Sequence, residues 1–250
     1  MAITIKSREQ IELMRESGRI VFEALAMLEK MVKPGITTKE LDSAAEHFIL
    51  KNGAKPSFKG YRGFPASICS SVNNEVIHGV PGLRRLKDGD IISIDIGVYK
   101  NGFHGDAART FPVGNVSDEV LKFISVTKQS FFEGIKFAKA GHRLYEVSNA
   151  IADCVEKNGY SVVRDWVGHG IGRNLHEEPQ IPHNRQNGKG PRLYPGMVLA
   201  IEPMVNMGTF EVRVLDDEQT VVTEDGKLSA HYENSVLITE GEPELLTLCG

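Results

Sequence analysis

The sequence contains GDIISID at Gly89–Asp95 and GMVLAIE at Gly196–Glu202. Both stretches begin with glycine, continue as a largely apolar run and end on a carboxylate. They are separated by 107 residues, counted from Asp95 to Glu202. Short apolar runs of this kind are typical of buried strands. We interpret the pair as an internal repeat, in which one strand in each half of the chain ends on an acid residue.

The repeat extends along the whole chain. Further matching segments are Pro34–Gly53 with Ala140–Gly159, Val76–Gly79 with Val167–Gly170, and His104–Asp106 with His231–Glu233. Each half thereby contributes one histidine and two carboxylates. We expect a single domain whose halves, roughly residues 1–115 and 116–250, face each other about a pseudo-twofold axis. These six side chains would then meet at one central site.

Composition excludes several classes of protein. The chain has 250 residues, a net charge of −4 and three cysteines, so it forms a sizeable core without a disulfide framework. The N-terminus lacks the apolar core of a signal peptide, and no apolar run reaches the ~18 residues of a membrane span. The basic cluster Arg84–Lys87 is short and predicts a solvated loop. We therefore expect a cytoplasmic protein that requires neither a membrane nor nucleic acid.

Helix signals occur in matching pairs. Capping boxes at Ser7–Gln10 and Thr37–Glu40 begin two amphipathic helices, which stop at Pro34-Gly35 and Asn52-Gly53. The second half repeats this scheme, because apolar residues spaced three or four apart recur over 121–135 and 147–155. Two helix pairs are therefore predicted, one in each half.

Runs rich in β-branched residues predict the strands. These runs are 66–72, 91–99, 198–205, 212–214, 220–223 and 235–239, and turns at Lys100–Gly102 and Asp225-Gly226 indicate hairpins. Strands and helices together predict an α+β fold. Its curved, mostly antiparallel sheet would carry the paired helices on the outer face and the site on the open face.

The acid residues in these runs favour a metal centre. Asp95 lies between isoleucines, where an ionised carboxylate is costly unless a cation or hydrogen-bond donors receive it. Asp106 follows across the predicted hairpin, and Glu202 and Glu233 are the counterparts in the second half. Neighbouring carboxylates repel one another, and a divalent metal is the usual remedy. The repeated occurrence favours this interpretation over isolated strand-end carboxylates that bind the backbone.

The histidines differ in their sequence context. His169 lies between glycines, which allow backbone and ligand to approach closely. Four carboxylates and one imidazole suit two divalent ions with bridging carboxylates and a shared water. His78 and His176 occur in Gly- and Pro-rich loops and are interpreted as functional. The others are expected on the surface (His47, His142, His183) or are left open between ligand support and ordinary loop polarity (His104, His231).

Several specific motifs carry a family resemblance. They lie at Gly60–Pro65, Ser71–Pro81, Asp95–Gly97, Gly105–Thr110, Gly168–Gly172, His176–Pro179, Ile201–Pro203 and Tyr232-Glu233. Over essentially the whole chain, the sequence resembles the methionine aminopeptidases, specifically their short bacterial-type class, type 1. The resemblance implies the pita-bread fold, an α+β domain with pseudo-twofold symmetry around a dinuclear metal centre.

The resemblance also implies how the metal ions are held. Asp95 and Asp106 would hold one ion, and Asp106 and Glu233 would bridge to a second ion completed by His169 and Glu202. Two divalent ions per chain are therefore expected, and Mn, Fe, Co and Zn all suit this ligand set.

Roles toward the substrate follow from the same resemblance. His78 would contact the substrate, His176 would hydrogen-bond the scissile carbonyl oxygen, and Glu202 would take and return the proton of the attacking water. The methionine side-chain pocket would be lined by Phe58, Tyr61, Phe64 and Cys69. Leu175 and Gln219 stand where some relatives carry aromatic residues, which makes the outer wall of the pocket less aromatic.

The function that this resemblance implies is metal-dependent hydrolysis. The chain would remove the initiator methionine from nascent proteins when the second residue is small and uncharged. Its partners would be nascent N-termini, with the ribosome as one place of encounter, and it would act as a monomer.

Two alternatives remain open at this point. One is a proline-directed aminopeptidase or dipeptidase of the same fold, although such enzymes usually carry a separate N-terminal domain, which this sequence lacks. The other is a binding protein that has lost catalysis, although such relatives lack the metal ligands, and all five candidates are present here.

Overall fold

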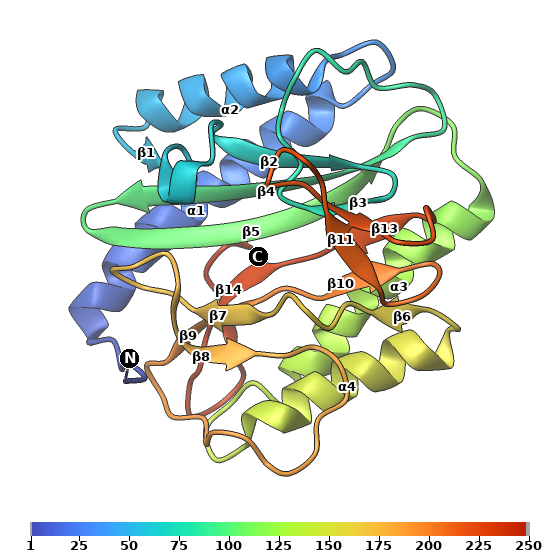
Figure 1. Cartoon of the computed structure of the whole chain (residues 1–250). Coiled ribbons are helices and arrows are strands. Elements are labelled where there is room, and N and C mark those ends of the chain that lie inside the picture. The colour runs from blue at the N-terminus through green and yellow to red at the C-terminus, as the bar shows by residue number, and fades with distance from the viewer. Residues whose placement is uncertain (1, 249–250) are drawn as a thin grey trace.

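The computed structural model describes residues 2–248. Its helices are α1 (Arg8–Met31), α2 (Thr38–Lys51), α3 (Asp118–Ile135) and α4 (Leu144–Lys157), with a 3-10 helix at Tyr61–Gly63. In Figure 1, α1 and α2 lie at the top and behind the long strands, and α3 and α4 lie at the lower right. The prediction of one helix pair in each half is confirmed.

The first half forms a four-stranded sheet around β4. The sheet contains β1 (Lys55–Pro56), β2 (Ile68–Val72), β4 (Ile91–Lys100) and β5 (Phe103–Pro112), and the first half also contains β3 (Glu75–Ile77). β5 pairs with β4 along its whole length, and β2 and β1 follow each other along the opposite edge. β3 leaves this sheet and joins a small sheet of the second half.

The second half contributes a five-stranded sheet and two small sheets. Its strands are β6 (Ser161–Val162), β7 (Gly168–Gly170), β8 (Glu177–Ile181), β9 (Val198–Ile201), β10 (Met204–Asn206), β11 (Val212–Val214), β12 (Val221–Thr223), β13 (Ser229–His231), β14 (Asn234–Leu237) and β15 (Glu244–Leu245). The sheet orders are β15-β14-β9-β7-β8, β13-β10-β6 and β11-β12-β3. All these pairs are antiparallel, as predicted.

Both predicted capping boxes begin helices. The Ser7 hydroxyl accepts the N–H of Gln10 at 3.3 Å, and the Thr37 hydroxyl accepts the N–H of Glu40 at 3.1 Å. The reciprocal bonds, from the backbone N–H of each capping residue to the Gln10 or Glu40 side chain, are also present. These bonds satisfy N–H groups that the first helical turn leaves without a partner.

Each half packs its own apolar core. In the first half, α1 and α2 bury residues such as Ile20, Leu28 and Leu41 against β4. In the second half, α3 and α4 bury Phe131 and Val147, among others, against the five-stranded sheet. Burial of each such side chain contributes about 1.5–3 kcal/mol, so the helices fix the strands that carry the acid residues.

Two strand predictions are wrong. The apolar run 198–205 is not one strand, because it breaks at Glu202-Pro203 into β9 and β10, and proline cannot donate to a central ladder. The turn at Asp225-Gly226 does not close a hairpin. β12 pairs with β11 and β3, whereas β13 pairs with β10, so these two consecutive strands belong to different sheets.

Side chains connect the halves where β5 meets the segment 231–235. The Ser235 hydroxyl accepts the N–H of Asp106 and donates to its carbonyl, both at 3.0 Å. Thr110 bonds the backbone of His231 in the same reciprocal way, at 2.8 and 2.9 Å. We call these contacts, together with those of Arg109 described below, the seam.

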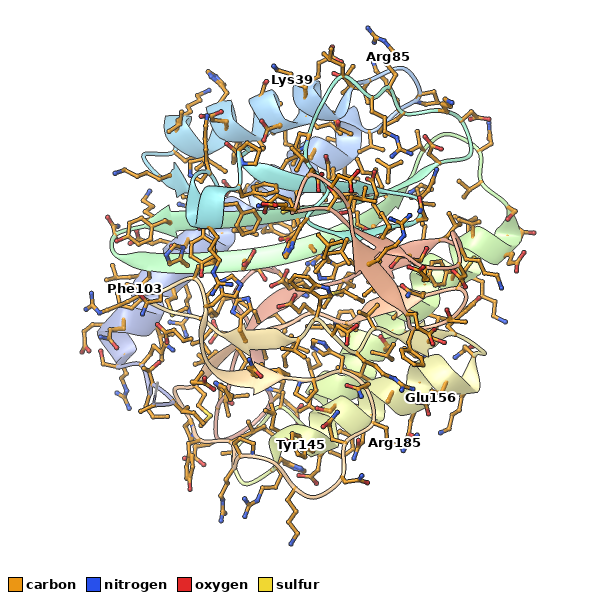
Figure 2. All side chains as sticks on the ribbon, viewed as in Figure 1. Lys39, Arg85, Phe103, Tyr145, Glu156 and Arg185 are labelled. Atoms are coloured by element: carbon orange, nitrogen blue, oxygen red, sulfur yellow. The ribbon has the colours of Figure 1, made fainter. Side chains whose placement is uncertain are left out.

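The surface agrees with the predicted solvated loop. Arg84, Arg85 and Lys87 are exposed, and Arg85 points outward at the top of Figure 2. Within residues 2–248, none of the helices combines the length and the apolar character that crossing a membrane requires.

Candidate functional site

The hairpin of β4 and β5 brings the first two acid residues together. Gly97 pairs with Asp106, and Asp95 pairs with Ala108. Because alternate residues of a strand share a face, Asp95 and Asp106 are diagonal neighbours on the same face of the sheet. The Lys100–Gly102 turn that sets this register was predicted from the sequence, and its hairpin is confirmed.

The second half supplies three further side chains. Glu202 follows β9 at the break before Pro203, and Glu233 immediately precedes β14. His169 lies in β7, and its Nε2 atom is 3.4 Å from Oε1 of Glu202. One ligand atom each of Asp106, His169 and Glu233 lie within 4.8 Å of one another. The structure thus gathers all five predicted ligands around one point.

The His169 ring is oriented by its own backbone. Nδ1 lies 2.9 Å from the carbonyl oxygen of Gly170, which can only accept, so Nδ1 carries the proton. Nε2 is left as the nitrogen that faces the carboxylates. Burial lowers the pKa of His169 to about 4, so the ring is neutral at pH 7. A neutral imidazole with a free Nε2 is the form that binds a metal.

The acid residues form a crowded cluster. Asp106 and Glu233 are buried, and Asp95 and Glu202 are half-buried. Burial raises the pKa of Asp95 to about 7. Burial, together with repulsion from the neighbouring carboxylates, raises the pKa of Asp106, Glu202 and Glu233 well above the usual range.

One oxygen of each carboxylate has no hydrogen-bond partner among residues 2–248. These buried atoms are Asp95 Oδ1, Asp106 Oδ1, Glu202 Oε1 and Glu233 Oε1. Four unpartnered carboxylate oxygens beside a neutral imidazole are costly for the protein alone. They are also the donor set that a divalent cation requires, so the residues fit a metal centre.

His78 occupies a strained position next to this cluster. It directly follows β3 and has a φ of 56°, in the left-handed region. The next residue, Gly79, lies directly against β2. Its N–H donates to Oγ of Ser71 at 3.1 Å, and an added Cβ would clash with the Ser70 carbonyl. Such backbone strain persists only where the surroundings impose it.

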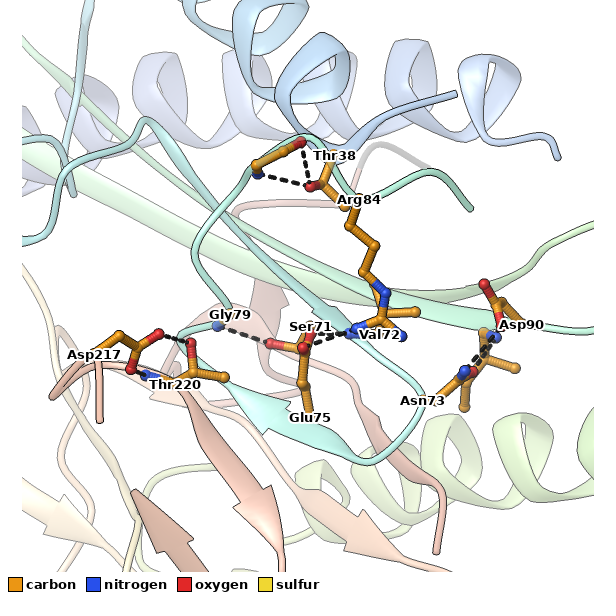
Figure 3. A network of polar contacts seen from close by, with 12 residues as sticks. Thr38, Ser71, Val72, Asn73, Glu75, Gly79, Arg84, Asp90, Asp217 and Thr220 are labelled. Carbon is orange, nitrogen blue, oxygen red and sulfur yellow. Dashed lines mark hydrogen bonds and ion pairs between the residues drawn. The ribbon is translucent and has the colours of Figure 1, made fainter. Parts of the chain in front are cut away.

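A polar network, drawn in Figure 3, holds the turn that leads to His78. The Glu75 carboxylate accepts the N–H of Val72 at 2.6 Å and pairs with Arg84 at 2.9 Å. Asp217 accepts the Thr220 hydroxyl at 2.5 Å, and Thr220 in turn lies 3.5 Å from the carbonyl of His78. The Trp166 ring meets the His78 ring edge-to-face, with centroids 5.0 Å apart.

His176 stands at the solvent side of the site. Its Nδ1 lies 2.9 Å from the hydroxyl of Tyr61, and the two rings stack at 5.2 Å. Its ring centroid is 4.1 Å from that of His169. The loss of solvent and the neighbouring His169 lower the pKa of His176, which keeps the ring neutral at pH 7.

A buried ion pair fixes the chain beside His176. Lys6 reaches Glu177 at 2.8 Å, and both side chains are almost fully buried. Thr4 also donates to this carboxylate, at 2.5 Å. The N-terminal segment therefore holds the residue that follows His176.

The four predicted pocket residues share one apolar cluster. Phe58, Phe64 and Cys69 are buried there, and Tyr61 packs against them. Cys69 pairs with Asp95 across β2 and β4, so the cluster borders the carboxylates directly. Leu175 belongs to the same cluster, whereas Gln219 is half-buried beside Thr220 in the β11–β12 turn.

The structure corrects one histidine and settles the position of another. His183 was expected on the surface, but it is 1% exposed, and its Nε2 accepts the backbone N–H of Glu202 at 3.1 Å. His231 is 2% exposed, with Nε2 3.8 Å from Oε2 of Glu202. His104 bonds the Ser57 hydroxyl through Nδ1 at 2.8 Å.

Arg109 was not singled out from the sequence. It donates to the carbonyl of Glu233, to that of Ala108 at 2.8 Å and to Oδ1 of Asn234 at 2.6 Å. Its guanidinium lies 4.2 Å from the centre of the Tyr232 ring. Nothing in the local sequence signals these contacts, because every partner except Ala108 lies in the other half of the chain.

Comparison with known proteins gives consistent results. Residues 12–240 match metallopeptidase family M24. A methionine aminopeptidase of Clostridium perfringens is 61% identical over 98% of this chain and 99% of that protein. Methionine aminopeptidase 1 of Bacillus subtilis is 57% identical over 98% of this chain and 99% of its own length.

Solved structures share the fold. Methionine aminopeptidase from Rickettsia prowazekii superposes with a TM-score of 0.97 at 38% identity, covering 99% of this chain and 100% of that one. The prolidase from Pyrococcus furiosus superposes with a TM-score of 0.81 at 24% identity, covering 98% of this chain and 66% of that one. The prolidase likeness concerns the fold alone.

Proposed function

Because this chain belongs to metallopeptidase family M24, we propose that its five clustered ligands hold two divalent ions for the removal of N-terminal methionine. The chain is a metal-dependent methionine aminopeptidase with the pita-bread fold. The observation that carries the proposed centre is the set of four buried carboxylate oxygens without a partner among residues 2–248, one of which, Oε1 of Glu202, lies 3.4 Å from Nε2 of His169. We treat the chain as one catalytic domain whose halves divide near residue 115.

We assign the ligands to the two ions as the resemblance to the methionine aminopeptidases implies. Asp95 and Asp106 would hold one ion, His169 and Glu202 would complete the second, and Asp106 and Glu233 would contribute to both. When bound, the ions supply Lewis acidity and lower the pKa of a water toward neutrality. Mn²⁺, Fe²⁺, Co²⁺ and Zn²⁺ are all compatible with this mixture of carboxylate and imidazole.

Glu202 is the proposed proton carrier. Its backbone is held by His183, and its carboxylate has a raised pKa caused by burial and by repulsion from Asp95 and Asp106. A carboxylate poised in this way takes a proton from the attacking water and returns it to the leaving amine.

His176 and His78 act on the substrate. Nδ1 of His176 is engaged by the Tyr61 hydroxyl at 2.9 Å. In the proposed tautomer that hydroxyl donates to Nδ1, and Nε2 carries the proton and donates a hydrogen bond to the scissile carbonyl oxygen. His78, held in its strained conformation, contacts the substrate backbone.

The apolar cluster of Phe58, Tyr61, Phe64 and Cys69 receives the methionine side chain. It borders Asp95 and is closed by Leu175. A small, uncharged second residue is required, because a long or charged side chain would have to be desolvated beside His78 and Trp166. The substrates are N-termini of nascent polypeptides, met in the cytoplasm and at the ribosome, by a monomeric enzyme.

Peptide hydrolysis tests the proposal. We would measure release of the N-terminal residue from Met-Ala-Ser, Met-Lys-Ser and an X-Pro peptide in which X is not methionine, with chelator and then with Mn²⁺ or Co²⁺ restored. Cleavage of Met-Ala-Ser alone, lost with chelator and recovered with metal, is expected. Cleavage of the X-Pro peptide alone would favour the proline-directed alternative, and no cleavage with metal restored would favour a binding protein.

A further inference from the structure

His231 is a buried histidine to which the proposed mechanism gives no role. Its side chain is 2% exposed, and its Nε2 atom has no hydrogen-bond partner among residues 2–248. The backbone N–H and carbonyl of His231 are both bonded to Thr110, so the ring is held by the seam and not by its own polar atoms. An unpartnered imidazole nitrogen in a buried polar site needs an explanation.

That nitrogen points at the acid cluster. It lies 3.8 Å from Oε2 of Glu202, while Nε2 of His169 lies 3.4 Å from Oε1 of the same carboxylate. Glu202 thus has one imidazole nitrogen facing each of its two oxygens. One ligand atom each of Glu202, His231 and Glu233 lie within 4.8 Å of one another, a second triad that shares Glu233 with the triad of Asp106 and His169.

The separation suits a shared cation better than a direct bond. A distance of 3.8 Å is beyond hydrogen-bond range. Two ligands that each lie about 2.0–2.2 Å from one ion are separated by at most about 4.4 Å. Two carboxylates and an imidazole are a donor set that first-row divalent ions accept.

We propose that His231 is a further metal ligand and that Glu202, His231 and Glu233 form a binding position for a divalent cation. This inference rests on the proposed metal centre and extends its ligand set from five residues to six. The two halves then contribute unequally, because the position that matches His231 in the first half is His104, whose Nδ1 is engaged by Ser57.

Three glutamine variants of the full chain test this ligand. Glutamine retains a polar side chain of similar length but removes the imidazole nitrogen. We would prepare His231→Gln, His169→Gln as the positive control and His104→Gln as the matched control. The metal-free proteins would be titrated with Mn²⁺ and with Co²⁺ in competition with a chelating dye. Pulsed electron paramagnetic resonance on the Mn²⁺ forms would count the coordinated imidazole nitrogens.

His231→Gln is expected to lower the affinity for one cation by at least about tenfold and to remove one imidazole nitrogen from the count. Loss of a residue that only supports a ligand already costs about 10–100-fold in affinity. His104→Gln should change neither measurement. Unchanged affinity and nitrogen count in His231→Gln, with both reduced in His169→Gln, would overturn this inference and leave the proposed function standing. Unchanged values in both variants would overturn the proposed metal centre itself.

Discussion

His78 and His169 occupy matching places in the repeat, yet their surroundings differ. His169 lies within β7, is 7% exposed and directs Nε2 at Glu202. His78 lies just after β3, is half-buried, has a left-handed backbone and packs against Trp166. The repeated motif therefore supplies one histidine from each half, and the packing of each half gives only His169 a contact with the Glu202 carboxylate, whereas we propose that His78 contacts the substrate.

The acid residues differ less between the halves. Asp106 and Glu233 match in the repeat, and both are buried on the same cluster. Asp95 and Glu202 match as well, although Asp95 lies within an unbroken strand and Glu202 follows a strand that Pro203 ends. The pseudo-symmetry is thus kept by the four carboxylates and lost by the two histidines.

The largest expected effect comes from removing one of the carboxylates that the two halves have in common. Asp106→Asn should lower kcat/KM by roughly 10³-fold or more, since a metal centre supplies several kcal/mol of transition-state stabilisation. The variant should still fold, because asparagine keeps the shape of the side chain and removes a repelled charge. Methionine release and a thermal melt of the metal-free protein would measure the two effects. Native-like turnover would contradict the assignment of Asp106 as a ligand.

Separate substitution of the two histidines tests the difference between His78 and His169. His169→Ala should weaken metal binding together with activity. His78→Ala should reduce turnover by about 10²-fold, the usual cost of a lost active-site hydrogen-bonding group, with metal affinity unchanged. Titration with Co²⁺ and peptide kinetics on both variants would separate these outcomes. If His78→Ala lost metal as readily as His169→Ala, the two halves would be functionally equivalent and the comparison above would fail.

The seam offers a third, smaller effect. Arg109→Met removes a guanidinium that bonds the carbonyls of Glu233 and Ala108 and the side chain of Asn234. We expect a loss of about 2–4 kcal/mol in the free energy of unfolding, because buried acceptors lose bonds from a charged donor. Arg109→Lys should lose less, since lysine keeps the charge but cannot bridge three acceptors. Urea denaturation would measure both.

Arg84→Met is the control for this comparison. Its ion pair with Glu75 is partly exposed, and such pairs are worth about 0–1 kcal/mol. Equal losses from Arg84→Met and Arg109→Met would show that the seam adds nothing particular to stability.

Local signals made much of this fold predictable. The capping boxes at Ser7 and Thr37 begin helices because their bonds close within four residues. The Asp95 and Asp106 pair was predictable because one tight turn sets the register between them. By contrast, the contact of His183 with the N–H of Glu202 depends on a long loop between β8 and β9, and no spacing rule reports it. Arg109 was missed for the same reason.

Predictions of strand boundaries failed where residues of the site interrupt the apolar pattern. The apolar run 198–205 was read as one strand, but the break at Glu202-Pro203 aims the carboxylate into the site. β7 and β8 were not predicted, since glycine-rich and glutamate-rich segments are poor strand formers. β7 contains His169 and β8 directly follows His176, so these two unpredicted strands position residues of the site.

Proton release on metal binding would separate the carboxylates from the histidines. Burial raises the pKa of the carboxylates and lowers the pKa of the histidines, so only the carboxylates hold protons at pH 7 that a metal would displace. In the metal-free fold, burial raises the pKa of Asp95 to about 7. Burial and mutual repulsion also raise those of Asp106, Glu202 and Glu233. Ligands bind metal in their deprotonated form. Binding of Mn²⁺ at pH 7 should therefore release at least about one proton, counted by calorimetry in buffers of different ionisation enthalpy, and Asp106→Asn should release fewer.

In the metal-free protein, the carboxylates and the histidines should change the folding stability with pH in opposite directions. Raised carboxylate pKa values stabilise the fold at low pH, and this contribution is lost as pH rises, in the case of Asp95 through about 7. Burial lowers the pKa of His169 to about 4 and that of His183 to about 3, so their contribution is present above about pH 6.5 and is lost on acidification toward those values. Thermal melts without metal should therefore show stability falling as pH rises above about 6.5, where the histidines are neutral in both states and the carboxylates are still losing protons. With saturating metal, the decline above pH 7 should vanish, because the ions then neutralise the repulsion that burial imposes on the carboxylates. A decline that persisted with metal bound would mean that these carboxylates are not the ligands.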